Sequence, residues 1–235
     1  MSGILYLIPT TLGESPINDV IPDNVKNIVN SINFYVVENI RTARRYLRRL
    51  DIKTPIDDLT FYTLNKHTTA SELTQFLAPI SKNNNVGVIS EAGAPGVADP
   101  GADIVKIAHK NNIKIVPLVG PSSILLSLMA SGLNGQNFSF LGYIPIKNPE
   151  RIKKIRAIEK NSFSFNQTQI FIEAPYRNIS LLTDILHNCN EQTQLCIATD
   201  ITLDSEFIKT QSIAEWKKNI PQINKRPTIF LLHKY

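Results

Sequence analysis

Short apolar segments alternate with helical patterns through the first half of the chain. Runs of aliphatic, β-branched and aromatic residues that end at breakers are typical of strands. Four such runs lie at residues 4–9, 33–37, 86–90 and 113–118. They are nearly continuous, which is the pattern of strands buried on both faces of a parallel sheet.

Helical patterns fill the intervals between these runs. They lie at residues 23–31, 41–50, 72–77, 104–108 and 122–131. Thr69 and Glu72 have the spacing of a capping box, and Asp99-Pro100 supplies a cap and a first-turn proline. Gly132 follows the last helix as a C-terminal stop. Alternation of strand and helix predicts an α/β domain with a mostly parallel sheet.

The second half has more strands and fewer helices. Strands are expected at residues 138–143, 168–173, 194–199, 206–212 and 228–233, and helices at 149–160 and 175–188. Because residues 199–209 read as strand, turn and strand, this half predicts a mixed sheet. The turn-rich segment SGLNGQN, residues 131–137, is expected to link the two halves. We therefore expect an N-terminal α/β domain over 1–133 and a C-terminal α/β domain over 134–235.

Composition narrows the class of protein. Of the 235 residues, 43% are hydrophobic and 19% are charged, which is typical of neither disorder nor a coiled coil. No apolar run approaches the roughly 18 residues that cross a bilayer, the first residues lack the features of a signal peptide, and Cys189 and Cys196 fit no disulfide framework. The expected location is therefore cytoplasmic. The net charge of +5 is compatible with an RNA partner, although frequent Lys, Asn and Ile point to codon bias as one source of the lysines.

Several kinds of catalytic site have no fingerprint in this chain. The glycines form no GxGxxG and no P-loop, and there is no GxSxG elbow. The four histidines are scattered without the spacing of metal ligands, so no metal is expected.

Three loops carry most of the chemical information. Residues 90–101, SEAGAPGVADPG, follow a predicted strand with three glycines and two prolines in twelve residues, so a flat ligand could approach their backbone. Residues 119–123, VGPSS, offer hydroxyls and free helix N–H groups to a carboxylate. Residues 9–14, PTTLGE, follow the first strand in the same way. The alternatives are an ordinary βα turn for the first loop and simple N-capping for the second. Together the three strand ends could line one crevice.

The chain resembles a known family in these segments and in others. IPTTLGE, VVENIRTARRYLRRLDIKTP, VISEAGAPGVADPG, VPLVGPSSILLSLMASGL, FLGYIP and FIEAPYR occur in the order found in the S-adenosylmethionine-dependent tetrapyrrole methylase superfamily. Within it, the chain is most similar to the bacterial small-subunit rRNA ribose 2′-O-methyltransferases. It differs from their usual PTPIGN, EDTR, SDAGTPG and YESPHR at polar positions and keeps the glycines and prolines, so it looks like a divergent member.

The resemblance implies a fold, a cofactor and a set of binding residues. It implies two α/β domains, S-adenosylmethionine folded into the cleft between them, and a homodimer. Carried over to this sequence, the cofactor-binding residues are Pro9, Leu12, Ala94, Pro95, Val97, Ser122, Ser123, Ile124, Ile172, Glu173, Pro227 and Thr228. Ala94 is small, as in the rRNA group, whereas many other members of the superfamily have an aspartate there.

A cluster of arginines and one glutamate complete the candidate site. Arg41, Arg45 and Arg48 share one face of a predicted helix, and Arg44 lies beside them. These four are predicted to bind RNA phosphates, the alternative being a solvated helix face. Glu38, at a strand end, is the candidate general base for a ribose hydroxyl, with a structural cap as the alternative.

The resemblance therefore implies an S-adenosylmethionine-dependent methyltransferase that modifies a ribose 2′-hydroxyl of small-subunit rRNA. Expected partners are rRNA or the small ribosomal subunit, and a second copy of the chain, with no membrane. The alternatives are a small-molecule methyltransferase of the tetrapyrrole type and a non-catalytic RNA-binding relative.

Overall fold

The computed structural model describes residues 3–65 and 67–235 of the chain. Contacts between residues divide the chain into two compact units, residues 1–122 and residues 123–235. Each unit has its own five-stranded sheet, and each is described in turn.

The sheet of the first unit is parallel throughout and has the strand order β3-β2-β4-β1-β5. Its strands are β1 (Leu5–Ile8), β2 (Phe34–Val37), β3 (Thr60–Thr63), β4 (Val86–Ile89) and β5 (Ile115–Pro117). Leu7 of β1 pairs with Val88 on one side and with Pro117 on the other. The predicted parallel sheet is confirmed, and the edge strand β3 was not expected from the sequence.

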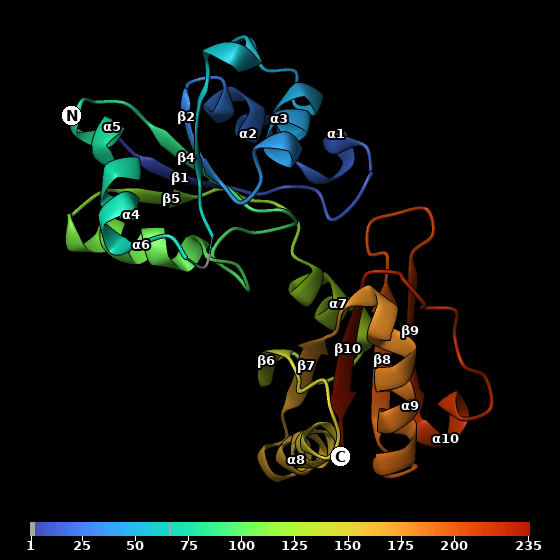
Figure 1. Cartoon of the computed structure of the whole chain (residues 1–235). Helices are drawn as coiled ribbons and strands as arrows, with labels where there is room; N and C mark the ends of the chain where they lie inside the picture. Colours follow the sequence, from blue (N-terminus) through green and yellow to red (C-terminus); the bar gives the residue numbers. More distant parts are fainter. Residues whose placement is uncertain (1–2, 66) are drawn as a thin grey trace. The chain divides into compact units, whose positions relative to one another are not determined.

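Helices cover both faces of this sheet (Figure 1). They are α1 (Ile17–Val20), α2 (Asp23–Val29), α3 (Ile40–Arg49), η1 (Ile56–Asp58), α4 (Ala70–Phe76), α5 (Ala78–Ser81) and α6 (Gly101–Lys110). Side chains alternate along each strand: Tyr35 and Val37 pack with α1–α3, whereas Phe34 and Val36 pack with α4–α6. Burial on both faces explains the continuous apolar runs of the sequence.

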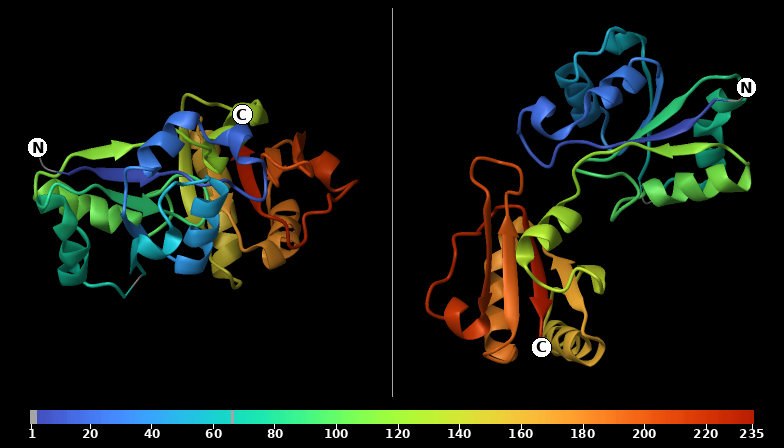
Figure 2. Two further views of the ribbon diagram at one scale, coloured as in Figure 1. Left: turned by 90° about the horizontal axis from the view of Figure 1, so that it is seen from above. Right: turned by 180° about the vertical axis from the view of Figure 1, so that it is seen from behind.

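The sheet of the second unit is mixed and has the order β6-β7-β10-β8-β9. Its strands are β6 (Phe138–Tyr143), β7 (Thr168–Ile172), β8 (Gln194–Thr199), β9 (Phe207–Ser212) and β10 (Thr228–His233). Only β6 and β7 are parallel, and the other three pairs are antiparallel. The helices are α7 (Ser123–Ser131), α8 (Glu150–Phe165), η2 (Pro175–Arg177), α9 (Asn178–Asn188) and α10 (Ile213–Trp216). The orange strands and helix of this unit can be followed from two further sides in Figure 2.

Helix α7 explains why the division of the chain differs from the expected boundary at 133. Leu128 of α7 packs with Ile170, Cys196 and Leu231 on one face of the second sheet, and α8–α10 cover the other face. Thr210 of β9 also donates to the carbonyl of Ser131 at 2.6 Å. The division therefore lies between residues 122 and 123, because the apolar side of α7 belongs to the second core.

Local signals in the sequence agree with the structure. Thr69 and Glu72 form the predicted capping box of α4, and Gly132 after α7 has a φ of +69°. Burial raises the pKa of the Cys189 thiol to about 12 and that of Cys196 to about 11, so both thiols are protonated at neutral pH.

None of the helices among the described residues is both long and apolar enough to span a bilayer. Within the same part of the chain, no group of three or more His, Cys, Asp and Glu side chains is placed to hold a metal ion.

Candidate functional site

The three loops singled out by their composition follow three neighbouring strands. Loop 9–14 follows β1, loop 90–101 follows β4, and loop 119–123 follows β5, and β1 lies between β4 and β5. Because the strands are parallel, their carboxyl ends lie at one edge of the sheet, where open α/β sheets bind ligands. Strand order thus brings together segments that are more than 100 residues apart in the sequence.

Close contacts join these loops to one another. The amide of Thr10 donates to the carbonyl of Gly93 at 2.9 Å. Gly120 lies against Pro9 so closely that a Cβ at residue 120 would be 2.3 Å from the Pro9 ring. Gly93 meets Leu12 and the carbonyl of Pro121, because a Cβ there would lie 3.1 Å from Leu12 Cδ2 and 3.3 Å from that oxygen. The three loops therefore form one packed surface of mostly backbone atoms.

Asp99 holds the shape of loop 90–101. Its carboxylate accepts hydrogen bonds from the amide of Gly96 at 2.9 and 3.0 Å and from the amide of Gly101 at 2.7 Å. Gly93, Gly96 and Ala98 have φ values of +71°, +83° and +62°, so the loop turns sharply three times. The sequence indicates Asp99 only as a helix cap, and its spacing to Gly96 gives no sign of this role.

The predicted cofactor residues of the first unit differ in exposure. Pro9 and Pro95 are buried, Leu12, Ala94 and Ser122 are half-buried, and Val97 is 50% exposed. Ser123 and Ile124 begin α7 and so belong to the second unit. A loop of this kind presents backbone groups and small side chains to a ligand.

The predicted cofactor residues of the second unit lie at one edge of its sheet. Ile172 ends β7 and pairs with Ile229, next to Thr228 at the start of the antiparallel β10. The side chain of Glu173 is fully buried: Oε1 accepts from the amide of Ala174 at 2.7 Å and from Arg177 at 2.6 Å. Its other oxygen, Oε2, is buried and has no hydrogen-bond partner. A buried carboxylate oxygen without a donor is unusual in proteins.

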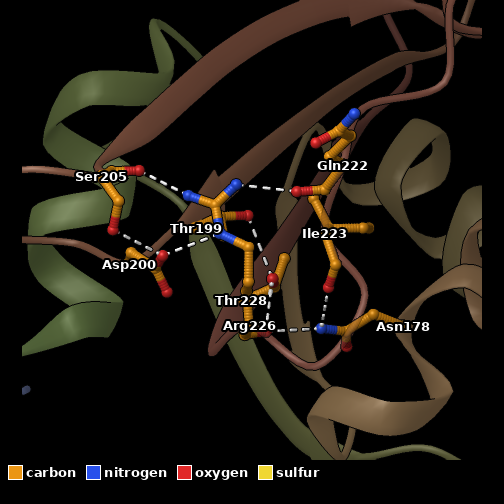
Figure 3. A network of polar contacts seen from close by, with 8 residues as sticks. All are labelled: Asn178, Thr199, Asp200, Ser205, Gln222, Ile223, Arg226 and Thr228. Atoms are coloured by element: carbon orange, nitrogen blue, oxygen red, sulfur yellow. Dashed lines mark hydrogen bonds and ion pairs between the residues drawn. The ribbon is translucent and has the colours of Figure 1, made fainter.

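Figure 3 shows how Arg226 fixes the segment that leads into β10. Its guanidinium donates to Asp200 at 2.8 Å and to the carbonyls of Gln222 and Ser205 at 2.7 and 2.5 Å. Its own carbonyl accepts from Asn178 at 2.7 Å and from the Thr228 hydroxyl at 3.0 Å. Pro227 and Thr228 therefore follow a residue whose side chain and backbone are both held by hydrogen bonds. The sequence gives no sign of this network.

The arginines of α3 fall into two groups. Arg44 pairs with Asp57 at 3.6 Å and lies over the Phe61 ring at 5.4 Å. Arg49 pairs with Glu14 at 3.5 Å and donates to the Ser15 carbonyl at 2.6 Å. These two guanidinium groups hold neighbouring segments in place.

The remaining three arginines have no such role within their unit. Arg41, Arg45 and Arg48 are exposed, and among the described residues of the first unit no carboxylate pairs with any of them. They share one face of the helix, as predicted. The five arginines of α3 therefore repel one another less than the sequence suggests, because Asp57 and Glu14 offset the charges of Arg44 and Arg49.

One side of α3 and loop 10–14 enclose a cavity of about 160 Å³, which we call the α3 cavity. Its walls are loop 10–14, residues 89–91, and Thr42, Ala43, Arg45, Tyr46 and Arg49 of the helix. Helix α3 shares this cavity with loop 10–14, because residues three and four apart on a helix face the same way.

Two hydrogen bonds tie α3 to the loops. The Tyr46 hydroxyl donates to the Pro9 carbonyl at 2.6 Å, and the Thr42 hydroxyl donates to Glu91 at 2.6 Å. Neither Tyr46 nor Thr42 was singled out in the sequence, where both look like ordinary helix residues.

Glu38 lies at the carboxyl end of β2 and faces a different, open cavity of about 680 Å³. Asn65, Asp99 and Asp103 also line this cavity. Burial is the main cause that raises the pKa of Glu38. The amide of Glu91, which donates to it at 3.4 Å, opposes this shift, and the nearby charges of Asp99 and Glu91 add to it. The alternative role as a helix cap falls to Asn39, whose side chain accepts from the amide of Arg41 at 2.9 Å.

Comparisons with known proteins give several similar chains. No family model matches. The chain is 29% identical over 234 residues to Ribosomal RNA small subunit methyltransferase I of Buchnera aphidicola subsp. Schizaphis graminum, covering 98% of this chain and 78% of that protein. It is 28% identical over 235 residues to the protein of that name from Vibrio cholerae, covering 99% and 77%. The protein of that name from Synechocystis sp. is 29% identical over 200 residues, covering 85% and 67%.

Solved structures show the same fold. The methyltransferase CobJ superposes with a TM-score of 0.65 at 16% identity, over 99% of this chain and 95% of that one. Uroporphyrin-III C-methyl transferase from Thermus thermophilus, complexed with S-adenosyl homocysteine, superposes with a TM-score of 0.56 at 12% identity, over 99% and 98%. At these identities the structural comparisons concern the fold alone.

Proposed function

We propose that this chain is a member of the tetrapyrrole methylase superfamily and an S-adenosylmethionine-dependent methyltransferase that modifies a ribose 2′-hydroxyl of small-subunit rRNA. One observation carries the proposal. The chain is similar over 98–99% of its length to proteins named as small-subunit rRNA methyltransferases, so the likeness includes both units and their loops.

Two features of the chain fit the cofactor. The packed loops after β1, β4 and β5 present backbone N–H and C=O groups and small side chains, which suit the flat adenine ring and the polar ends of S-adenosylmethionine. The buried Oε2 of Glu173 lacks a donor, and the cofactor carries hydroxyl and amino groups that can supply one. That both units contribute to one site, as the resemblance implies, stays a prediction.

The residues of the chain have two tasks in the reaction: they position the reacting groups away from water, and they remove the proton of the acceptor hydroxyl. When bound, S-adenosylmethionine supplies an electrophilic methyl group on a sulfonium. The protein must then hold the acceptor oxygen in line with that methyl group and keep water away. We assign the second task, removal of the hydroxyl proton, to Glu38, because a carboxyl group whose pKa is raised is a stronger base than an ordinary glutamate.

Methyl transfer to isolated ribosomal subunits tests the proposal. Small subunits from a bacterial strain that lacks its own enzyme of this kind are incubated with the protein and methyl-labelled cofactor. Label in rRNA, retained in a 2′-O-methylated nucleoside after digestion, is the expected result. A parallel incubation contains a tetrapyrrole in place of the subunits, and label in that compound instead supports the first alternative. Cofactor binding without transfer in either incubation supports a non-catalytic RNA-binding protein.

We further propose that the protein is a cytoplasmic homodimer. The proposed substrate is a cytoplasmic particle, and α7 exposes two large apolar side chains, Leu125 and Met129, at 52% and 78%. Light scattering at micromolar concentration should therefore give twice the 26.3 kDa mass of one chain. A mass of one chain contradicts the homodimer and leaves the methyltransferase proposal intact.

A further inference from the structure

The α3 cavity holds more polar groups than the cofactor proposal uses. Five of its side chains carry hydroxyl groups, from Thr10, Thr11, Thr42, Tyr46 and Ser90. Four others are charged: Glu14, Arg45, Arg49 and Glu91. What this cavity can bind depends on which of these groups are not already engaged within the protein.

Most of the polar groups are already engaged within the first unit. Thr10 donates to the Ser90 carbonyl at 3.4 Å, and the Ser90 hydroxyl donates to the Gly93 carbonyl at 3.2 Å. Thr42 and Tyr46 donate to Glu91 and to the Pro9 carbonyl, and Arg49 is held by Glu14. Both carboxylates of the cavity therefore have partners.

Two groups remain: a guanidinium, which can only donate, and a hydroxyl, which can donate or accept. Among the described residues of the first unit, no carboxylate pairs with the Arg45 guanidinium, and the hydroxyl of Thr11, which lines the cavity, makes no hydrogen bond. A guanidinium fork and a hydroxyl match the non-bridging oxygens of a phosphate group. Because the guanidinium is always charged and only donates, an anionic oxygen suits it better than the oxygens and nitrogens of a neutral sugar or base do.

We propose that Arg45 and Thr11 bind one phosphodiester group of the RNA in the α3 cavity, on the side of loop 10–14 that faces α3. That the phosphodiester belongs to RNA rests on the proposed function. Arg41 and Arg48 lie on the same helix face outside the cavity, where they would contact the neighbouring phosphates of the RNA strand. Because Thr10 of the same loop bonds to Gly93, the bound phosphate would lie just across the loop from the proposed cofactor surface.

Steady-state kinetics with small ribosomal subunits as the substrate distinguish binding in the α3 cavity from a general attraction between the arginines and RNA. At saturating cofactor, Arg45→Ala should lower kcat/KM for subunits by about tenfold to a hundredfold, which is the loss expected for hydrogen bonds from a charged donor. Arg48→Ala is the matched control, because it removes the same charge from the same helix face outside the cavity. It should cost no more than about threefold and act mainly through salt dependence. Thr11→Val should also lower kcat/KM, and all three variants should bind cofactor as the native protein does.

Inorganic phosphate provides a probe that does not depend on methyl transfer. At matched ionic strength, replacing chloride by phosphate should raise the Tm of the native protein and of Arg48→Ala more than that of Arg45→Ala, which keeps only the general stabilisation by phosphate salts. If the native protein methylates no subunits but this phosphate effect is present and is smaller in Arg45→Ala, the anion site stands and the proposed function fails. Equal losses in kcat/KM for Arg45→Ala and Arg48→Ala, or an unchanged phosphate effect in Arg45→Ala, overturn the assignment of Arg45.

Discussion

Replacing Gly120 by alanine should disturb the candidate site at its tightest contact. The added Cβ would lie 2.3 Å from both Cβ and Cγ of Pro9, whereas ordinary contacts begin at 3.4 Å. Pro9 has little freedom to move away, because its ring is buried and its carbonyl accepts from Tyr46 at 2.6 Å. Overpacking of this kind costs about 1–3 kcal/mol. Displacing Pro9 would also weaken the Tyr46 hydrogen bond, which is worth about 1 kcal/mol.

Two measurements check this expectation. Differential scanning calorimetry should show a Tm lower by about 2–4 °C for each kcal/mol lost, the usual figure for a chain of this size. Calorimetric titration with S-adenosylmethionine should show at least about tenfold weaker binding, which corresponds to about 1.4 kcal/mol of strain passed to the loops. The control is Gly135→Ala, since no atom lies within 4 Å of a Cβ built there. A lowered Tm with native cofactor affinity in Gly120→Ala would show that these loops do not form the cofactor surface, and a native Tm would show that the contact with Pro9 is not tight.

Three further predictions concern the loops and the candidate base. Ala94→Trp should weaken cofactor binding by steric exclusion, and normal titration of this variant would mean that loop 90–101 is not at the cofactor. Asp99→Ala should cost about 1–3 kcal/mol of stability and weaken cofactor binding, because two loop amides lose their acceptor; the exposed Asp103→Ala serves as the control. Glu38→Gln should slow methyl transfer by about a hundredfold or more. In the native enzyme the rate should rise with pH through a pKa above 4.5, and this limb should vanish in Glu38→Gln. Because the folded state holds this proton more tightly, the contribution of Glu38 to stability is present below pH 4.5 and is lost as pH rises through the raised pKa. At neutral pH Glu38→Gln should therefore unfold at a higher temperature than the native protein, and a lower Tm would contradict the raised pKa.

Most helices and strands could be predicted from the sequence, whereas it could not be predicted which of them lie next to one another in the fold. Strands with long apolar runs, such as β8 and β10, were found with the bounds that the structure gives them. Edge strand β3 was missed because both of its end residues are exposed and it has little apolar pattern. Strand order is invisible in the sequence, since pairing of β1 with β4 and β5 joins segments that are distant in the chain. Helix α7 was predicted at the right residues but assigned to the first domain, because an apolar helix face fits either sheet.

The candidate site shows the same division between local and distant information. Glycines and prolines mark loop 90–101 in the sequence because they determine its backbone directly. The roles of Asp99 in that loop and of Asn39 as the helix cap depend on hydrogen bonds that composition does not reveal. The arginine pattern gave the shared face of α3 correctly. It could not show that Asp57 neutralises Arg44, since that pair depends on how the chain folds back after the helix.

The division of the chain between residues 122 and 123 has a consequence for how such a protein can change over evolution or by engineering. Linkers between domains are ordinarily the places where chains accept insertions, cuts and the exchange of modules. Here the two units join inside VGPSS, at the start of α7, so the junction and a proposed ligand loop are the same few residues. Neither unit can be transplanted or expressed alone without cutting that loop. We therefore expect the two units to be inherited as a pair, and chimaeras between relatives to keep function only when both sides of residue 122 come from one parent.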